Sequence, residues 1–249
     1  MKDGLSAMRN KKQRLKYLLR EIEKGNITSK NFYSKINIHE YVEFNKKLKE
    51  AVREKQLKEF KNNRPSDVTF ISGRAGIGKT TLAKFLNIKN KKFYTIKSWG
   101  KYPLDDTMGY ESIIYVNLNP STFKPKDFLR FFDQSDELFG LSRYYKSKVI
   151  TANEIILDST LDLNGFSKVL KKSNITPIDF YSKINHYIYL EDKKMFIYKF
   201  DKEKALKNIK DNNEIQDYIS SFYTLEEEKT FDVEEIILDL EDKQTDELG

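Results

Sequence analysis

One segment constrains the fold of this chain more than any other, the run FISGRAGIGKTT at residues 70–81. It contains the complete pattern G-x-x-x-x-G-K-[ST], a glycine-rich loop whose backbone N–H groups can turn inward on a polyphosphate. An apolar, β-branched run at 68–71 precedes the loop, and an amphipathic stretch opens at Thr80. A phosphate loop requires a strand before it and a helix after it, because the helix N-terminus favours an anion. We therefore expect the chain to bind a nucleoside triphosphate.

The pattern also assigns chemistry within the loop. Lys79 is expected to reach the β- and γ-phosphates as a catalytic cation, and the Thr80 hydroxyl is expected to complete the shell of a Mg²⁺ ion. The expected ligands are thus ATP and Mg²⁺. The residues expected to hold the nucleotide are Gly73, Arg74, Ala75, Gly76, Ile77, Gly78, Lys79, Thr80 and Thr81.

Apolar periodicity predicts an α/β fold in three parts. Residues 1–62 form a helical module, and residues 63–200 form a three-layer domain whose sheet is parallel at its centre. Residues 201–249 add a helix and an acidic tail that begins at Glu226 and contains an apolar patch. The predicted elements are strands at 68–71, 93–96, 112–116 and 154–157, helices at 126–132 and 202–223, and a hairpin of strands at 187–190 and 195–198.

Charge is unevenly distributed along the chain. The formal net charge is +7, yet residues 1–62 carry 17 Lys and Arg against 8 Asp and Glu, and residues 201–249 carry 6 against 16. A basic body suits a polyanion such as nucleic acid, through phosphate contacts and counterion release. Solvated lysines without a partner explain the same composition, so charge alone leaves both interpretations open.

Composition excludes several classes of protein. The chain has no cysteine and only two histidines, far apart in sequence, so we expect neither a disulfide framework nor a zinc site. No apolar run approaches the roughly 18 residues that a membrane span needs, and the N-terminus lacks the apolar core of a signal peptide. We expect a soluble, cytoplasmic protein without a membrane partner.

Further motifs follow the phosphate loop in a fixed order. They are Tyr94…Trp99, Gly109-Tyr110-Glu111, the apolar strand at 113–116, the phenylalanine-rich run at 128–133, the basic run at 143–148 and the strand at 155–157 with Asp158-Ser159 after it. This order resembles the helicase half of the Rep initiators of rolling-circle plasmids and small circular single-stranded DNA viruses.

The resemblance implies an AAA+-like P-loop NTPase of helicase superfamily 3, a ring that translocates on single-stranded DNA. It also implies that residues 1–62 are the oligomerisation module of a homo-oligomer, with a hexameric ring as the product. The apolar stripe from Tyr41 to Val52 agrees, since it exceeds what so short a module can bury by itself. The His-hydrophobe-His motif of an origin-nicking half does not occur in the sequence. Two interpretations follow: the protein acts with a separate nickase as partner, or it is a derived relative that kept the scaffold and lost part of the chemistry.

The chain departs from the family pattern after the strand at 112–116. The family places two acids there, one to hold Mg²⁺ through water and one to polarise the attacking water, but this chain has Asn117 and Leu118. Asn117 can still orient a metal-bound water, whereas leucine cannot act as a base, so we expect weak hydrolysis. Asp105, Asp106 and Glu111 precede the strand, and ligands gather at the carboxyl ends of strands, which disfavours them as substitutes.

Two further positions differ from the family. Asp158, Ser159 and Thr160 stand where a Thr-Ser-Asn-like cluster senses the γ-phosphate. Lys183 stands at the position of an arginine finger and is our candidate for that catalytic role, although it is a point charge without a bidentate fork.

Two functions from different classes therefore compete. The first is an ATP-driven, superfamily 3-like DNA helicase or translocase in replication of a plasmid, phage or satellite element. The second is a hydrolysis-deficient, nucleotide-bound DNA-binding or regulatory subunit. A small-molecule kinase is disfavoured because no arginine-rich lid is found. Trp99, between Lys97 and Lys101, is the candidate for stacking on bases, and core packing is the alternative for it.

Overall fold

A computed structural model gives the fold of the chain. It describes residues 2–28, 31–60, 67–90, 92, 94–99, 110–122, 139–140, 148–149, 152–171, 177–211 and 217–246. The helix predicted at 126–132, the basic run at 143–147, and Lys101, Asp105 and Asp106 lie outside these residues.

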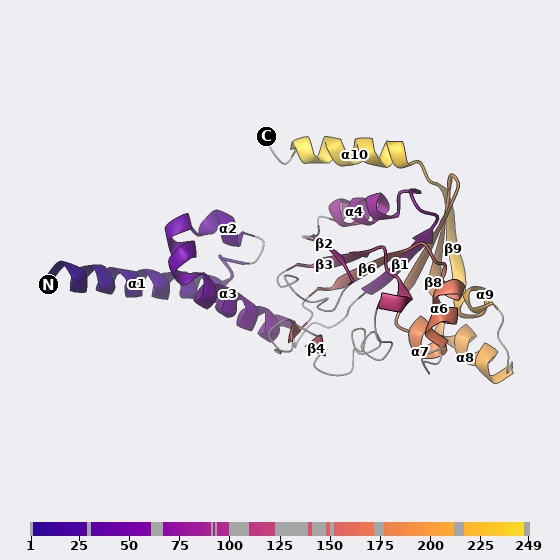
Figure 1. Cartoon of the computed structure of the whole chain (residues 1–249), viewed down its shortest axis with the longest axis horizontal. Coiled ribbons are helices and arrows are strands. Elements are labelled where there is room, and N and C mark those ends of the chain that lie inside the picture. Colours follow the sequence, from indigo (N-terminus) through magenta and orange to yellow (C-terminus); the bar gives the residue numbers. More distant parts are fainter. Residues whose placement is uncertain are drawn as a thin grey trace.

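Seven strands form one mixed sheet in the order β2-β3-β6-β1-β7-β8-β9 (Figure 1). The strands from β2 to β7 in this order run parallel, and β8 and β9 are antiparallel additions at one edge. The predicted parallel centre and the predicted hairpin are thus confirmed. The strands are β1 Asp67–Gly73, β2 Tyr94–Ser98, β3 Ser112–Val116, β6 Glu154–Ser159, β7 His186–Glu191, β8 Lys194–Phe200 and β9 Tyr223–Thr230, and a separate antiparallel pair is β4 Phe139–Gly140 with β5 Lys148–Val149.

Helices precede, connect and follow these strands. They are α1 Lys2–Lys24, α2 Phe32–Lys35, α3 Ile38–Phe60, α4 Lys79–Lys89, a 3-10 turn at Pro120–Thr122, α6 Leu163–Lys171, α7 Pro177–Tyr181, α8 Lys202–Asp211, α9 Tyr218–Phe222 and α10 Val233–Asp246. The helix predicted at 202–223 is interrupted. Asp217 caps a new helix, α9, by accepting hydrogen bonds from the N–H groups of Ile219 and Ser220.

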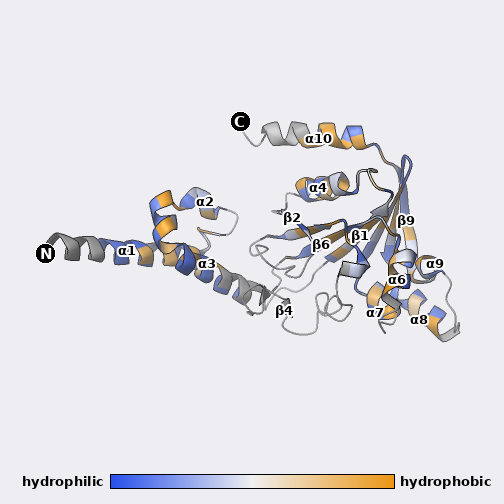
Figure 2. Cartoon of the chain, viewed as in Figure 1, coloured by the Kyte–Doolittle hydropathy of each residue, from blue (hydrophilic) through white to orange (hydrophobic). Residues whose placement is uncertain are grey.

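The sheet buries an apolar core on each face. Neighbouring residues of one strand point to opposite faces, so Phe70 contributes to one core and Ile71 to the other. Helices α6, α7, α8 and α9 cover the Phe70 face, and α4 covers the Ile71 face together with the first residues of α10. Hydrophobic residues mark the central strands and the flanking helices α4 and α7 (Figure 2). The result is the three-layer α/β arrangement that the strand and helix pattern predicts.

The strand order reverses next to β1. From β1 the chain passes through α4 to β2 and returns through β3 to β6 beside β1, and then it crosses to β7 on the other side of β1. Such a switch point leaves a crevice at the carboxyl ends of the strands, which is where α/β proteins bind ligands. The residues after β1, β3 and β6 meet at this edge.

The N-terminal module has a core of its own. Helices α1 and α3 pack together and bury Leu18, Ile22, Leu48 and Val52. The apolar stripe on α3 is predicted to be larger than the module can bury. In the structure it is largely buried inside the module, because α1 packs its own apolar face against it. Among the described side chains of the module, Tyr33, Ile38 and Val42 are well exposed, at 70%, 73% and 74%.

A reciprocal cap fixes the start of α3. The side chain of Asn37 accepts from the N–H of Glu40 at 2.9 Å, and the Glu40 carboxylate accepts from the N–H of Asn37 at 3.1 Å. This is a capping box, which satisfies N–H groups that the helix leaves open. The guanidinium of Arg14 on α1 also donates to Glu40, so the cap ties the two long helices together.

The acidic segment after Glu226 is not a tail, which corrects the sequence-based expectation. Residues 223–230 form β9, the last strand of the sheet, where Lys194 pairs with Glu228 at 2.8 Å and Lys199 with Glu226 at 3.8 Å. Opposite charges across two strands stabilise such a pair. The apolar patch predicted at 233–240 begins α10, which packs beside α4. None of the described helices is long and apolar enough to cross a membrane.

Candidate nucleotide-binding site

The loop between β1 and α4 lies at the switch point and joins the central strand to a helix N-terminus. Gly76 and Gly78 have φ angles of 78° and 98°, in the left-handed region that side chains disfavour. Gly78 is the N-cap of α4, and no side chain caps that helix end. The first N–H groups of an eleven-residue helix are thus available to an anion at the carboxyl edge of the sheet.

Lys79 lies beneath this loop. Only 6% of the residue is exposed, and its Nζ donates to the carbonyls of Gly73 and Arg74, both at 3.0 Å. Burial lowers the pKa of the Lys79 ammonium, and the negative charge of Asp158 opposes that shift. The ammonium is held by its own loop at the place where the motif predicts a contact with the phosphates.

Asp158, near the end of β6, faces the same helix N-terminus. It is fully buried, and its carboxylate accepts a 2.6 Å hydrogen bond from the Thr80 hydroxyl and a 3.0 Å hydrogen bond from the N–H of Asn117. The parallel pairing of β6 with β1 sets Asp158 opposite Ile71, two residues before the loop begins. A buried carboxylate thus contacts the hydroxyl that is predicted to bind Mg²⁺.

Asn117 and Leu118 point to different environments. Asn117 is exposed and has a φ of 52°, a left-handed conformation that asparagine tolerates. Leu118 is 2% exposed and packs in the core on the Phe70 face. The structure therefore brings Asn117 to the carboxyl edge with the loop, whereas Leu118 serves packing.

The other residues of the motif also fall into place around the loop. Ile77 is buried against the sheet, Ala75 is exposed, and Thr81 is half-buried in the first turn of α4. Arg74 is exposed and lies 3.6 Å from Asp192 in the β7–β8 turn. The loop is therefore anchored at Ile77 and Lys79 and open to solvent at residues 74–76.

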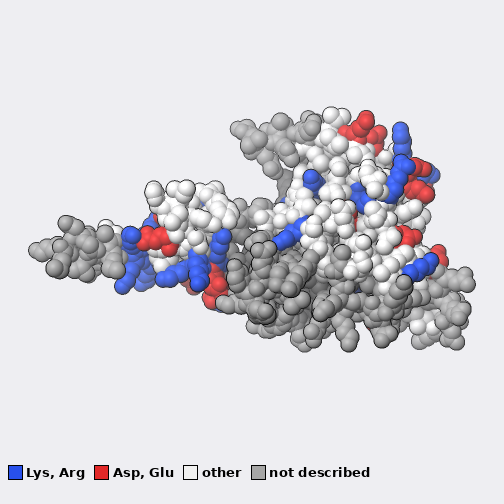
Figure 3. Space-filling view, viewed as in Figure 1, with Lys and Arg blue, Asp and Glu red and all other residues white. Residues whose placement is uncertain are grey.

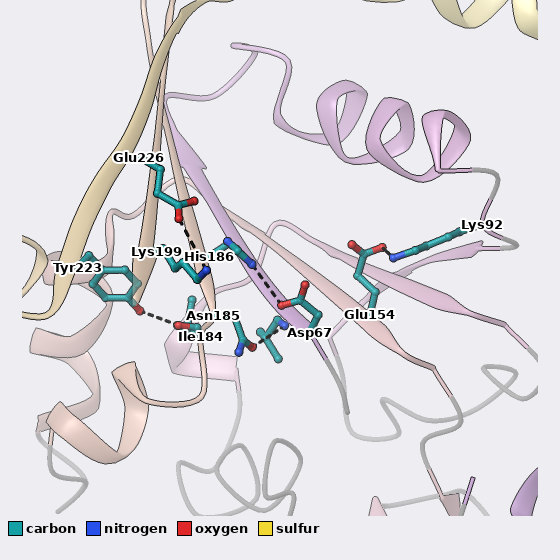
Figure 4. A network of polar contacts seen from close by, with 10 residues as sticks. Asp67, Lys92, Glu154, Ile184, Asn185, His186, Lys199, Tyr223 and Glu226 are labelled. Atoms are coloured by element: carbon teal, nitrogen blue, oxygen red, sulfur yellow. Dashed lines mark hydrogen bonds and ion pairs between the residues drawn. The ribbon is translucent and has the colours of Figure 1, made fainter. Parts of the chain in front are cut away.

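Lys183 does not join the phosphate loop of its own chain. It lies two residues before Asn185, which bonds both the N–H and the carbonyl of Val68 at the start of β1. Figure 4 shows this amino-end network, in which His186 lies 3.6 Å from Asp67 and Lys92 lies 3.0 Å from Glu154. Glu111 is also at this edge, since its carbonyl accepts from the N–H groups of Asn153 and Glu154.

Trp99 packs against the core on the Phe70 face and meets Tyr115 edge to face, with ring centroids 5.1 Å apart. This contact favours the packing interpretation over stacking on bases, because aromatic pairs of this geometry are typical of cores.

The C-terminal segment closes over the far side of the loop. A Cβ atom built at Gly78 would lie 2.6 Å from a methyl group of Val233 and 3.3 Å from the ring of Phe231. Phe231 is buried, and its N–H donates to the carbonyl of Lys193 at 2.7 Å. One side of Gly78, at the start of α4, therefore lies against residues that the sequence analysis assigns to a tail.

Sequence analysis missed the contact between Asp158 and Thr80. The signal that could have revealed it was a carboxylate at the end of an apolar strand, in a position where the family has a neutral residue. That signal needed the strand order, since only the pairing of β6 with β1 places Asp158 beside Thr80.

Comparison with known proteins finds a sequence that this chain resembles. No family model matches the chain. The chain is 29% identical over 184 residues to a protein named "Replication protein" from Onion yellows phytoplasma, strain OY-M. The match covers 74% of this chain and 48% of that protein, so the chain spans about half the length of the relative.

Proposed function

We propose that this chain binds ATP with Mg²⁺ at Gly73–Thr81 and acts as a superfamily 3-like DNA helicase or translocase in replication of a plasmid, phage or satellite element. The observation that carries the proposal is the buried Lys79 under an uncapped helix N-terminus, with the Thr80 hydroxyl beside a buried carboxylate. The similarity to a protein named for replication supports the biological setting.

Each residue of the site has a role in this proposal. The N–H groups at the start of α4 bind the phosphates, and Lys79 moves from its two carbonyl partners to the phosphate oxygens. Thr80 and Asp158 form the donor set that would hold Mg²⁺, because hydroxyl and carboxylate oxygens are the ligands this ion prefers. Bound Mg²⁺ supplies charge neutralisation on the phosphate chain.

Calorimetry of ATP binding with Mg²⁺ tests the site. Lys79→Ala should lose at least about tenfold in affinity, since charge-assisted hydrogen bonds to the phosphates are lost. Lys89→Ala is the matched control, because it removes the same charge from the exposed end of the same helix. Equal affinity in the wild type and the Lys79→Ala variant would refute the site.

Single-stranded DNA is the proposed partner. Lys12, Lys16 and Arg20 recur every fourth residue on α1 and are exposed, so they form one basic stripe. Figure 3 shows Lys and Arg side chains gathered along the N-terminal helices. Replacing all three with Gln should reduce the slope of log K against log salt by about 2, at roughly 0.7 per phosphate contact. Replacing the exposed lysines Lys168, Lys202 and Lys207 in the same way should not change the slope.

A homo-oligomeric ring is the proposed assembly. The exposed apolar residues Tyr33, Ile38 and Val42 give the N-terminal module a surface for a second copy of the chain. Mass photometry with ATP and DNA should show an oligomer, and Ile38→Glu with Val42→Glu should reduce it to a monomer. The same change at the exposed pair Ile237 and Leu238 of α10 is the control. A monomer for the wild type under all these conditions would contradict the assembly.

The second candidate function is a nucleotide-bound subunit that hydrolyses ATP poorly and binds DNA or regulates an active relative. The burial of Leu118 favours it, because this position offers no group that could activate water. Steady-state ATPase activity with and without single-stranded DNA separates the two candidates. Turnover stimulated by DNA in the usual range of about 1–100 s⁻¹ supports the translocase, and nucleotide binding without turnover supports the regulatory subunit.

A further inference from the structure

We propose that Asp158 is the carboxylate that holds the Mg²⁺ shell together with Thr80, in place of the acids missing after β3. This inference rests on the proposed binding of ATP and names a residue that the family pattern does not assign to this task. It moves the metal-holding acid by one strand, from β3 to β6, which lies directly beside β1.

The geometry of Thr80 is the first argument. The loop hydroxyl that would bind Mg²⁺ donates to Oδ2 of Asp158 at 2.6 Å, so one end of the carboxylate is next to the place where the ion must sit. A carboxylate that bonds a metal-binding group orients that group and raises its basicity. Of the described alternatives that the sequence suggests, Glu111 lies at the other edge of the sheet, and Asn117 carries no charge.

Burial is the second argument. A fully buried carboxylate is costly unless charges and donors compensate it. Asp158 accepts from the Thr80 hydroxyl and the Asn117 N–H, and it exerts an electrostatic effect on Lys79. An ionised carboxylate has about four lone-pair sites, so these two hydrogen bonds leave capacity for a metal-bound water. Asn117 thereby gains a role through its backbone, which positions Asp158.

The same contacts limit what Asp158 can do. Its carboxylate is tied to Thr80 and the N–H of Asn117, so it holds the metal and does not serve as the base for the attacking water. The family divides two tasks between two acids. Asp158 thus retains the first task, holding Mg²⁺, but not the second, activating the attacking water. We expect binding of ATP to depend strongly on Mg²⁺, whether or not hydrolysis is fast.

The test compares ATP affinity in Mg²⁺ with ATP affinity in EDTA, by calorimetry on the full chain. In the wild type, Mg²⁺ should raise the affinity. Asp158→Asn should lose about tenfold or more of this enhancement, in line with changes to groups that orient metal ligands. Its affinity in EDTA should stay the same or rise, because a negative charge near the phosphates is removed. Asp162→Asn, an exposed residue four positions further on, is the control for loss of one charge.

A merely structural role gives a different result, since the affinities in Mg²⁺ and in EDTA would then fall together with the melting temperature. That outcome, or an unchanged Mg²⁺ enhancement in Asp158→Asn, overturns the inference and leaves nucleotide binding intact. A wild type that binds ATP in neither condition removes the proposed function and this inference together.

A second variant keeps the test decisive if Asp158→Asn does not fold. Thr80→Val removes the hydroxyl and leaves Asp158 in place, and it should lose the same Mg²⁺ enhancement. In the double variant the two losses should not add, because both residues serve one metal shell. A full enhancement in Thr80→Val would overturn the inference on its own.

Discussion

The N–H of Leu118 donates a 2.6 Å hydrogen bond to the carbonyl of Asp158, so the pairing of β3 with β6 continues beyond the last residue of β3. The hydroxyl of Ser159 then donates to the carbonyl of Leu118 at 2.8 Å. These two bonds hold the side chain of Leu118 in the core and leave Asn117 at the open edge of the sheet.

Restoring a family-like acid should therefore succeed only at the first of the two positions. Leu118→Asp should lower the free energy of unfolding by about 3 kcal/mol or more, because an unpaired carboxylate would be buried. Asn117→Asp should cost about 1 kcal/mol or less, since its side chain is exposed and aspartate tolerates the left-handed backbone. Urea unfolding measures both changes. Equal stability of the two variants would contradict the core position of Leu118.

The capping box of α3 should make stability depend on pH. The hydrogen bond from Arg14 is the main cause that lowers the pKa of Glu40, and the N–H of Asn37 adds to it. A carboxyl with a lowered pKa in the folded state stabilises above its unfolded pKa of about 4.3 and loses that contribution as the pH falls through the folded value. Glu40→Gln should cost about 1 kcal/mol at pH 7, because the charge-assisted hydrogen bond from Arg14 becomes a weaker neutral one, and the difference from the wild type should shrink below about pH 4.

Thermal unfolding between pH 3.5 and 7 checks this dependence. Glu43→Gln is the matched control on the same helix, because Glu43 forms an exposed pair with Lys11 at 2.9 Å. Glu43→Gln should lower the free energy of unfolding by about 0.5 kcal/mol or less. A pH-independent effect of Glu40→Gln would show that the charge of Glu40 is not what stabilises the module.

Gly78 and Gly76 should respond differently to alanine. Both have left-handed φ angles, so each variant should pay about 1–2 kcal/mol of backbone strain. Only at Gly78 would the new methyl meet Val233 and Phe231, whereas nothing lies within 4 Å of a Cβ at Gly76. Hydrogen exchange should therefore rise at the start of α10 in Gly78→Ala and stay unchanged there in Gly76→Ala. The same exchange in both variants would argue against contact between the loop and the C-terminal segment.

Phe231 should be a main anchor of the C-terminal segment. Its side chain is 4% exposed in the core that α4 covers, so Phe231→Ala should lower the free energy of unfolding by about 3–5 kcal/mol. Leu238→Ala on α10 should change it by about 0.5 kcal/mol or less, because that side chain is 62% exposed. Chemical denaturation of both variants makes the comparison. If both variants lose equally little free energy of unfolding, the packing of Phe231 contributes little to stability.

Local features of the chain were predictable because their signals are local. The phosphate-loop pattern, the apolar strand before it and the helix after it lie within a few neighbouring turns of sequence, and all were found where expected. The strand at 112–116 was predicted to the residue. Hydrophobic patterning could not show that β6 lies beside β1, and this neighbour relation is what brings Asp158 to Thr80.

The last strand was missed for a different reason. The segment YTLEEEKT is acidic and exposed along most of its length, so it lacks the alternation that marks a strand with one buried face. The strand that it pairs with, β8, and the lysines that face its acidic side chains are distant in the sequence. The packing of α3 on α1 also depends on two segments that are separate in the sequence. The apolar stripe on α3, taken alone, therefore predicts more exposed apolar surface than the module has.

The cover that Phe231 and Val233 form over Gly78 has a consequence for the order in which the protein can mature. The phosphate loop is synthesised before the residues that pack against it, because Phe231 and Val233 lie far downstream of Gly78 in the sequence. A nascent chain that carries the whole loop still lacks this cover. We expect the loop to reach its final packing only after β9 and the start of α10 have been made, which delays a fully formed nucleotide site until these segments have been synthesised.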